Sequence, residues 1–198
     1  MLNINNNFVL RQIESTDDAS KFSLGNASFT PLKIFLQKNA FDFHQYEIAK
    51  TFVFVNPEYS ANRIWGYITL MTSEVCLDKH QRPVETSAAS KYNSYPAAKI
   101  ARLAIDKALH KRGYGKKLLD WGINHIRLSV MPHIGCRFLV VDSKRESISF
   151  YQKNGFVFFN TNTNQTDEYP MMYLDLYRPS PYVKQNELTD NSSEIVSV

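Results

Sequence analysis

Residues 97–119, AAKIARLAIDKALHKRGYGKKLL, constrain the fold of this 198-residue chain more than any other segment. The segment opens with an apolar run over residues 100–105, which is typical of a buried strand. A polar turn follows, and Gly113 and Gly115 then precede a helical pattern. Glycines let the backbone approach a ligand closely, and the first N–H groups of a helix have no partners within the helix. This order of strand, glycine turn and helix predicts a binding site for phosphate.

The spacing of the glycines decides which phosphate loop this is. A Walker A loop needs four residues between its glycines and Ser or Thr after the lysine, and neither condition holds. A dinucleotide fingerprint needs a third glycine where this chain has Leu118. Two glycines alone also fit a plain turn, so the prediction depends on the strand before them and the helix after them. Charge supports it, because five cations flank the turn: Lys107, Lys111, Arg112, Lys116 and Lys117.

The rest of the chain alternates between strand and helix patterns. Strands are expected at 8–13, 51–55, 64–72, 136–141, 156–159 and 171–176. Thr30 followed by Pro31 predicts a helix start with Thr30 as its N-cap. Ser143 followed by Glu146 has the capping-box spacing, so a second helix is expected there, ending at Asn154-Gly155. Gly66 within the strand 64–72 suggests a bulge.

Four segments carry weaker patterns. Residues 41–47 fit either a loop or a helix, 80–96 read as a long surface loop, and 160–169 as a polar loop. The chain length predicts one domain over residues 1–178, and the period-free tail 179–198 is expected to be disordered or loosely attached.

Composition narrows the class of protein. Apolar residues make up 43% of the chain, enough to fill a sizeable core, and the net charge of +4 is compatible with an anionic partner. Cys76 and Cys136 have no metal or redox spacing, and the histidines show no mutual metal spacing, so no metal is expected. The N-terminus lacks signal-peptide features and no segment resembles a membrane span, which predicts a cytoplasmic protein.

Two motifs resemble the GNAT N-acetyltransferases, which use acetyl-CoA. HKRGYG at 110–115 is similar to their pyrophosphate loop, R/Q-x-x-G-x-G/A, with His110 in place of Gln or Arg. SFYQKNGF at 149–156 is similar to their late helix and strand, A-x-x-F-Y-x-x-x-G-F. The resemblance spans residues 8–177. It implies an α/β (α+β) GNAT fold, in which helices flank a central mixed, mostly antiparallel sheet.

A closer resemblance is to the acetyltransferase toxins of bacterial toxin–antitoxin pairs. The segments that carry it are 22–26, 32–40, 51–55, 64–70 and 96–106. That subgroup acetylates the amino group of aminoacyl-tRNA, which blocks translation, and a ribbon-helix-helix antitoxin usually accompanies it. The resemblance implies Tyr151 as the catalytic acid and allows a homodimer. The expected acetyl-CoA contacts are Leu103, Ala104, Ile105, Lys111, Arg112, Gly113, Tyr114, Gly115, Lys116, Lys117 and Ser143.

The chemistry of acetyl transfer bears on the choice of acceptor. The amine must be neutral, and the departing thiolate must gain a proton, which the Tyr151 O–H can supply. An amine like that of lysine has a pKa of about 10.4 and needs a base, whereas an α-amino group at about 7.7–8.0 needs far less help. No carboxylate precedes Asp106 in this segment, which favours an α-amino acceptor, although Glu74 remains a candidate base acting through water.

Three alternatives stay open at this point. The chain could be an N-acetyltransferase for a small amine or a protein N-terminus, or a module of the same fold that binds CoA without catalysis. Tyr151 itself fits a plain role in core packing. Ser143 is better explained as a helix cap than as a nucleophile, because no His–Asp arrangement accompanies it.

Overall fold

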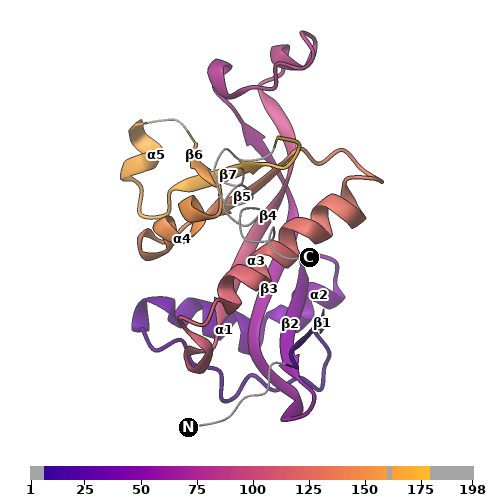
Figure 1. Cartoon of the computed structure of the whole chain (residues 1–198), viewed down its shortest axis with the longest axis vertical. Coiled ribbons are helices and arrows are strands. Elements are labelled where there is room, and N and C mark those ends of the chain that lie inside the picture. The colour runs from indigo at the N-terminus through magenta and orange to yellow at the C-terminus, as the bar shows by residue number, and fades with distance from the viewer. Residues whose placement is uncertain (1–6, 160–161, 179–198) are drawn as a thin grey trace, which may run out of the picture. The chain divides into compact units, whose positions relative to one another are not determined.

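The computed structural model describes residues 7–159 and 162–178, and Figure 1 traces them. They form two compact units. The N-terminal unit contains the chain up to Thr72 together with Ile100–Asn124, and the C-terminal unit contains Ser73–Lys99 and the chain from His125 onward. The single domain over residues 1–178 stays a prediction, and the tail 179–198 lies outside the described residues.

The strands form a seven-stranded mixed sheet in the order β1-β2-β3-β4-β5-β7-β6. Neighbours β1–β2, β2–β3, β5–β7 and β6–β7 are antiparallel, and β4–β5 is parallel. This confirms the predicted mixed, mostly antiparallel sheet. The strands are β1 (Val9–Gln12), β2 (Lys50–Asn56), β3 (Ser60–Cys76), β4 (Ser94–Ile105), β5 (Phe138–Asp142), β6 (Val157–Phe158) and β7 (Met171–Asp175). The helices are α1 (Thr30–Lys38), α2 (Ala40–Gln45), α3 (Tyr114–His125), α4 (Ile148–Lys153) and α5 (Asn162–Thr166).

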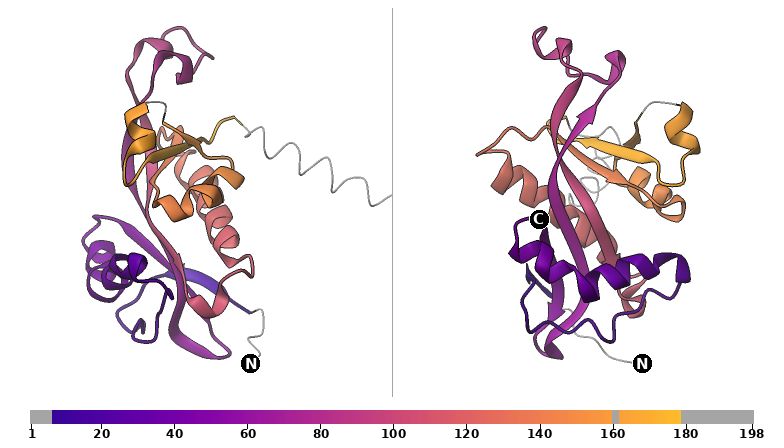
Figure 2. Two further views of the ribbon diagram at one scale, coloured as in Figure 1. Left: turned by 90° about the vertical axis from the view of Figure 1, so that its left-hand side faces the viewer. Right: turned by 180° about the vertical axis from the view of Figure 1, so that it is seen from behind.

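In the N-terminal unit, α1 and α2 cover one face of the strands and α3 covers the other (Figure 2). Side chains of successive strand residues point to opposite faces, and β2 shows this alternation. Val53 packs with the buried residues of α1 and α2. Phe52 and Phe54 point the other way and meet Trp121 and Tyr114 of α3, with ring centroids 4.6 and 5.6 Å apart. Both faces of β2 are therefore buried, which explains its nearly continuous apolar sequence.

Gly66 lies at an irregularity between β2 and β3, as the sequence suggested. Phe54 pairs with Gly66 but Val55 pairs with Ile64, so β3 carries one extra residue here. A Cβ atom on Gly66 would lie 2.5 Å from Cδ1 of Ile105 and 3.2 Å from the carbonyl oxygen of Ala104. Glycine suits this close approach, because any Cβ atom would require the Ile105 side chain to move and would press on the Ala104 carbonyl.

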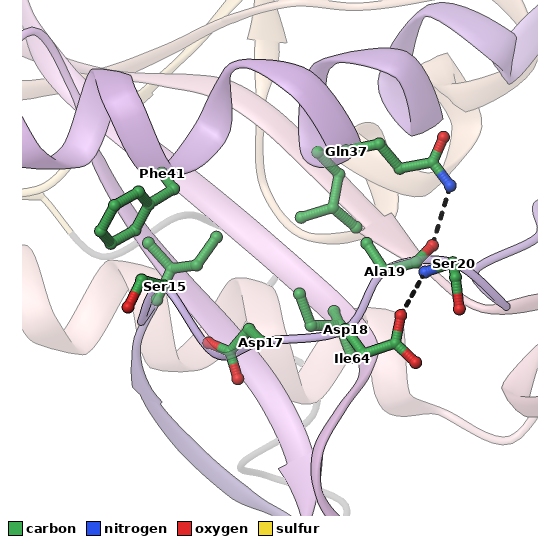
Figure 3. Close-up of a pocket in the computed structure, with 10 residues that line it drawn as sticks. Ser15, Asp17, Asp18, Ala19, Ser20, Gln37, Phe41 and Ile64 are labelled. Atoms are coloured by element: carbon green, nitrogen blue, oxygen red, sulfur yellow. Dashed lines mark hydrogen bonds between the residues drawn. The ribbon is translucent and has the colours of Figure 1, made fainter.

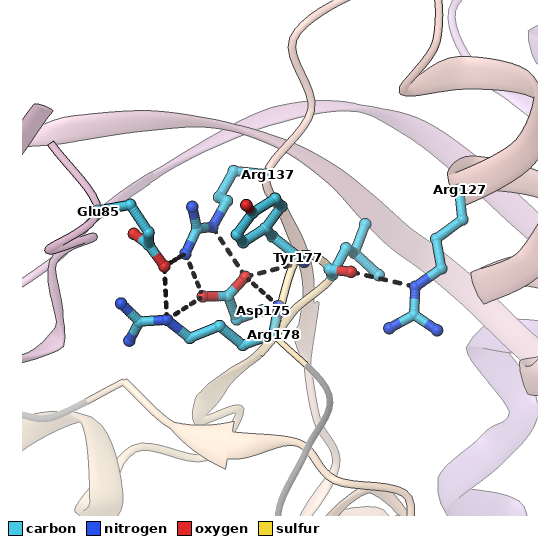
Figure 4. Close-up of polar contacts among 7 residues, drawn as sticks. Glu85, Arg127, Arg137, Asp175, Tyr177 and Arg178 are labelled. Carbon is cyan, nitrogen blue, oxygen red and sulfur yellow. Dashed lines mark hydrogen bonds and ion pairs between the residues drawn. The ribbon is translucent and has the colours of Figure 1, made fainter.

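The C-terminal unit has its own apolar core and a four-membered ion network beside it. The core joins residues of β3, β4, β5 and β7 with Leu77. In the network, Arg137 holds Asp175 through two hydrogen bonds of 2.8 Å and reaches Glu85 at 3.0 Å (Figure 4). Arg178 also donates to Glu85, at 2.7 Å. Glu85 comes from the β3–β4 connection, so the network fastens that connection to β5 and β7.

Both predicted N-caps are wrong, whereas the predicted stop at Asn154-Gly155 is confirmed. Phe29, not Thr30, precedes α1, because the chain already turns helically over Ala27–Phe29, a 3₁₀ turn that Asn26 caps. At the second helix, the Ser143 N–H bonds to the carbonyl of Pro170 and the hydroxyl bonds to the carbonyl of Lys144. Ser143 thus continues the strand direction of β5, and α4 begins only at Ile148.

Some loop boundaries also differ from the prediction. The ambiguous segment 41–47 is mostly helical, as α2. The long loop predicted at 80–96 is the connection 77–93, because β4 already begins at Ser94, and it contains two 3₁₀ turns, Lys79–Gln81 and Ala89–Lys91. Part of the polar segment 160–169 forms the short helix α5. In the first case apolar packing decided the structure, since Ala40 is fully buried in the N-terminal core.

Candidate acetyl-CoA site

The predicted strand, turn and helix are present in the N-terminal unit. β4 ends at Ile105, a 3₁₀ turn covers Lys107–Leu109, and α3 begins at Tyr114. We call residues 106–116 the anion loop. Its backbone enters the left-handed region at Lys111 (φ 59°) and at Gly113 (φ 79°). Glycine adopts that conformation without the cost that a Cβ imposes, which is the physical reason for Gly113.

Asp106 holds the start of the anion loop, a role that was not predicted from the sequence. Its buried carboxylate accepts hydrogen bonds from the N–H of Ala108 and the N–H of Ser23, both 2.9 Å long. The N–H of Lys107 donates in turn to the carbonyl of Ser23 at 2.7 Å. An Asp two residues before the N–H that donates to it is a turn signal in the sequence. Ser23, however, lies 83 residues away, and nothing in the sequence marks it.

His110 stands at the position where the family motif has Gln or Arg. Its Nε2 atom lies 2.9 Å from the carbonyl oxygen of Ile105. Because a carbonyl only accepts hydrogen bonds, this geometry assigns the proton to Nε2. The imidazole thus ties the middle of the anion loop to the last residue of β4. The departure from the motif replaces one side chain by another that stabilises the loop.

The loop cations and the first residues of α3 divide into different roles. Lys111 and Arg112 are exposed, and Lys116 is paired with Asp120 at 2.6 Å one helical turn later. The N–H of Lys117 donates to the carbonyl of Gly113 at 3.1 Å, so it already belongs to the helix and only its charge remains for a ligand. The ring of Tyr114 is buried, so this residue would contact an anion through its backbone N–H.

Residues 103–105 lie at the end of β4. Leu103 is half-buried, and Ala104 and Ile105 are buried. The last residue of β4 that pairs with β5 is Lys99, and the strand continues to Ile105. The N–H of Asp106 donates to the carbonyl of Trp65 at 2.7 Å, which fixes the end of β4 beside β3.

Tyr151 and Ser143 belong to the C-terminal unit, whereas the other ten predicted site residues belong to the N-terminal unit. The ring of Tyr151 packs against Phe150 and Phe156, with centroids 5.2 and 5.3 Å apart. Burial raises the pKa of its phenol, so Tyr151 stays protonated at neutral pH and retains a proton to donate. Ser143 is buried, and its hydroxyl donates to the carbonyl of Lys144.

A pocket of about 390 Å³ lies in the N-terminal unit beside α1 (Figure 3). None of its lining residues is a predicted site residue. Its two carboxylates serve local structure, because Asp17 takes two hydrogen bonds from Arg11, at 2.8 and 2.6 Å, and Asp18 caps Ser20 at 2.7 Å. Both carboxylates of the pocket are therefore engaged in local hydrogen bonds.

Two further findings concern the described part of the chain. It contains no group of three or more His, Cys, Asp or Glu side chains placed to hold a metal ion. None of its helices combines the length and the apolar character needed to cross a membrane.

Comparison with known proteins gave a family and a set of similar folds. Residues 62–158 match the acetyltransferase (GNAT) domain family, whereas curated protein sequences gave no match.

A tyrosine-to-phenylalanine variant of KacT has 19% identity and a TM-score of 0.70, covering 92% of this chain and 99% of that one. AtaT complexed with acetyl-methionyl-tRNAfMet has 20% identity and a TM-score of 0.67, with coverages of 92% and 99%. A tyrosine-to-phenylalanine variant of the AtaT toxin, bound to the C-terminus of the antitoxin AtaR and acetyl-CoA, has 18% identity and a TM-score of 0.66, with coverages of 93% and 99%. At these identities the likeness establishes the fold.

Proposed function

This chain carries an acetyltransferase domain of the GNAT family at residues 62–158, and from that premise we propose that it transfers acetyl groups from acetyl-CoA to the amino group of aminoacyl-tRNA. The observation that carries the proposal is the anion loop. It joins the end of β4 to the N-terminus of α3, has Gly113 in a left-handed conformation, and is flanked by exposed cations. A helix N-terminus with flanking cations suits a pyrophosphate.

Each part of the site has a role in this proposal. The pyrophosphate of acetyl-CoA binds the N–H groups of residues 112–116, with Lys111, Arg112, Lys116 and Lys117 supplying charge. The pantetheine arm runs along Leu103–Ile105, where β4 extends six residues beyond its last pair with β5. Asp106 and His110 hold the loop in shape. We keep Ser143 as a proposed cofactor contact because it lies in the chain shortly before α4, the helix that carries Tyr151.

The reaction is a transfer of one acyl group between two nucleophiles. The lone pair of the acceptor amine attacks the thioester carbonyl carbon, and the carbon–sulfur bond breaks as the amide forms. The departing thiolate takes the proton of the Tyr151 hydroxyl, the ammonium formed by the attack loses its proton to solvent, and the Tyr151 phenolate regains a proton from solvent. The pKa of an α-amino group is about 7.7–8.0, so part of the acceptor is neutral before the attack and needs no strong base.

The similar structures support the acceptor and the partner. AtaT was solved with acetyl-methionyl-tRNAfMet, and separately with the antitoxin AtaR and acetyl-CoA. Both likenesses cover nearly the whole of each chain. KacT and AtaT were each solved as a variant with a tyrosine replaced by phenylalanine, which supports a tyrosine in the mechanism. We extend the proposal to a toxin that acts in the cytoplasm and is neutralised by a ribbon-helix-helix antitoxin, and we include a homodimer as its assembly.

The test is translation in a cell-free system to which the purified protein is added, with and without acetyl-CoA. We expect translation to stop only when acetyl-CoA is present, and the aminoacyl-tRNA to carry an N-acetyl group by mass spectrometry. Normal translation together with turnover of free polyamines or peptide N-termini would favour the small-amine or N-terminal acetyltransferase instead. Binding of acetyl-CoA without turnover of any amine would identify a non-enzymatic module.

A further inference from the structure

Three side chains of the N-terminal unit form a column that runs from the core to the surface. Tyr67 of β3 is fully buried at its base. The ring of Phe35 of α1 stacks on it, with centroids 6.4 Å apart and planes inclined by 22°. The guanidinium carbon of Arg102 of β4 lies 5.1 Å from the centre of the Phe35 ring. Arg102 is exposed, so a charged planar group ends the column in solvent.

The column is held rigidly from below. The Tyr67 hydroxyl donates a hydrogen bond of 2.6 Å to the carbonyl of Leu32, which fastens β3 to α1. Phe43 of α2 meets the Phe35 ring edge-on, at 5.5 Å and 89°. Arg102 also donates through Nη1 to the carbonyl of Ala101. The guanidinium plane is thus placed before any ligand arrives, which lowers the conformational entropy lost on binding.

The surface around the column is cationic. Helix α1, TPLKIFLQK, contains Lys33 and Lys38 and no acidic residue. Within the part of the chain that the structure describes, neither lysine forms an ion pair, and Arg102 forms none. These three cations are therefore not engaged in ion pairs and can attract an anionic partner.

We propose that the Arg102–Phe35 column receives the terminal base of the acceptor end of tRNA, stacked on the guanidinium plane. This inference rests on the proposed function and adds a contact of the acceptor substrate. Proteins bind single-stranded RNA ends by stacking bases on aromatic rings and on arginine planes, with nearby cations along the backbone. The column supplies the plane, and Lys33 and Lys38 supply the cations.

The place of Arg102 in β4 fits this substrate. Arg102 immediately precedes Leu103–Ile105, the residues proposed to contact the pantetheine arm. It lies on the α1 face of the sheet, together with Ala104, whereas α3 lies on the opposite face. A base on Arg102 therefore approaches β4 from the face opposite α3. Because the amino acid is esterified to the terminal adenosine, a base held here keeps the acceptor amine close to the strand.

The experiment is a binding cycle with two RNAs and three proteins. The RNAs are one deacylated tRNA with its complete 3′ CCA end and the same tRNA trimmed of its terminal adenosine. The proteins are the wild type, Arg102→Lys and Lys38→Gln. Arg102→Lys keeps the charge but removes the plane, and Lys38→Gln removes a neighbouring charge but keeps the column. A thermal melt and the acetyl-CoA dissociation constant, expected to be unchanged in both variants, show that the variants are folded.

We expect the wild type to bind the complete tRNA about 5- to 150-fold more tightly than the trimmed one, the range that one stacked base spans. Arg102→Lys should bind both RNAs nearly equally. Lys38→Gln should bind both more weakly and keep the preference. Equal binding of the two RNAs by the wild type, or a full preference in Arg102→Lys, would overturn the stacking site while leaving tRNA acetylation untouched. Absence of both tRNA binding and tRNA acetylation in the wild type would overturn the proposed function itself.

Discussion

Burial keeps Tyr151 protonated, which suits its proposed role as the general acid. The ring is enclosed by Phe150 and Phe156, and burial raises the pKa of the phenol. Tyr151→Phe keeps the ring and removes the proton. Because general acid catalysis typically contributes about 10²–10⁴-fold, the rate of acetyl transfer should fall by that factor. Single-turnover kinetics measures the rate, and a thermal melt checks that stability is retained.

Tyr151→Phe has a matched control in the same element. Phe150→Tyr adds a hydroxyl to the neighbouring ring, and it should not restore the rate when combined with Tyr151→Phe. A normal rate in Tyr151→Phe would remove this residue from the mechanism. Loss of rate together with loss of stability would show that the hydroxyl is structural.

Glu85 makes the stability of the C-terminal unit depend on pH. Hydrogen bonds from Arg137, and then from Arg178, lower its pKa from 4.5 to about 2. A lowered pKa stabilises the fold fully above pH 4.5, and this contribution is lost as the pH falls towards 2. The melting temperature of Glu85→Gln should therefore lie below that of the wild type at pH 7, and the difference should shrink between pH 4.5 and 2. The effect should be small because the pair is solvent-exposed. A difference that does not change with pH would contradict the assignment.

Single residues were predictable where the backbone alone sets the requirement. Gly113 and Gly66 were found from the sequence because glycine marks left-handed turns and close contacts. The role of Asp106 in holding the anion loop was not predicted, because its hydrogen-bond partner Ser23 is distant in the chain. The Arg102–Phe35 contact was missed for the same reason: it joins a strand to a helix through tertiary packing.

At the scale of elements, the anion loop is the part most open to a direct test. Gly115→Glu places a bulky anion in the first turn of α3, where the pyrophosphate is proposed to bind. Steric overlap and charge repulsion should abolish acetyl-CoA binding in isothermal titration calorimetry. The control Asn124→Glu adds the same side chain at an exposed position near the other end of α3 and should bind normally. Wild-type affinity in Gly115→Glu would disprove the loop assignment.

Strands, long helices and the stop of α4 at Asn154-Gly155 followed from the sequence, whereas helix starts did not. α1 and α3 lie where the apolar spacing placed them. The caps failed because short 3₁₀ turns precede α1 and α4, and such turns depend on local hydrogen bonds that no sequence period reveals. Asn26, not Thr30, caps the helical turn, and the N–H of Ser143 bonds to the carbonyl of Pro170 just beyond β5.

At the scale of the whole molecule, the net charge of +4 predicts how substrate binding responds to salt. Release of counterions from RNA makes the logarithm of the binding constant fall linearly with the logarithm of salt concentration. The slope for aminoacyl-tRNA should be steep, and the slope for a small amine should be near zero. Fluorescence anisotropy at several salt concentrations measures both. A flat response for tRNA would favour a small acceptor.

The overall class was predictable because two motifs and the strand order act together. The mixed, mostly antiparallel pairing agrees with the prediction from the resemblance. The division into two units was not predicted. Both β3 and β4 pass from one unit to the other, so no linker marks the boundary in the sequence.

Gly66, inside the sheet, lies against the end of β4, the strand proposed to contact the cofactor. The hydrogen atom at this position leaves room for the carbonyl of Ala104 and the methyl group of Ile105. A single methyl group there would require the Ile105 side chain to move and would press on the carbonyl of Ala104, two residues before the anion loop. Natural variation at this buried position would therefore change the affinity for acetyl-CoA while every residue proposed to contact the cofactor stays the same. A survey of variants restricted to surface residues around the loop would overlook the position entirely.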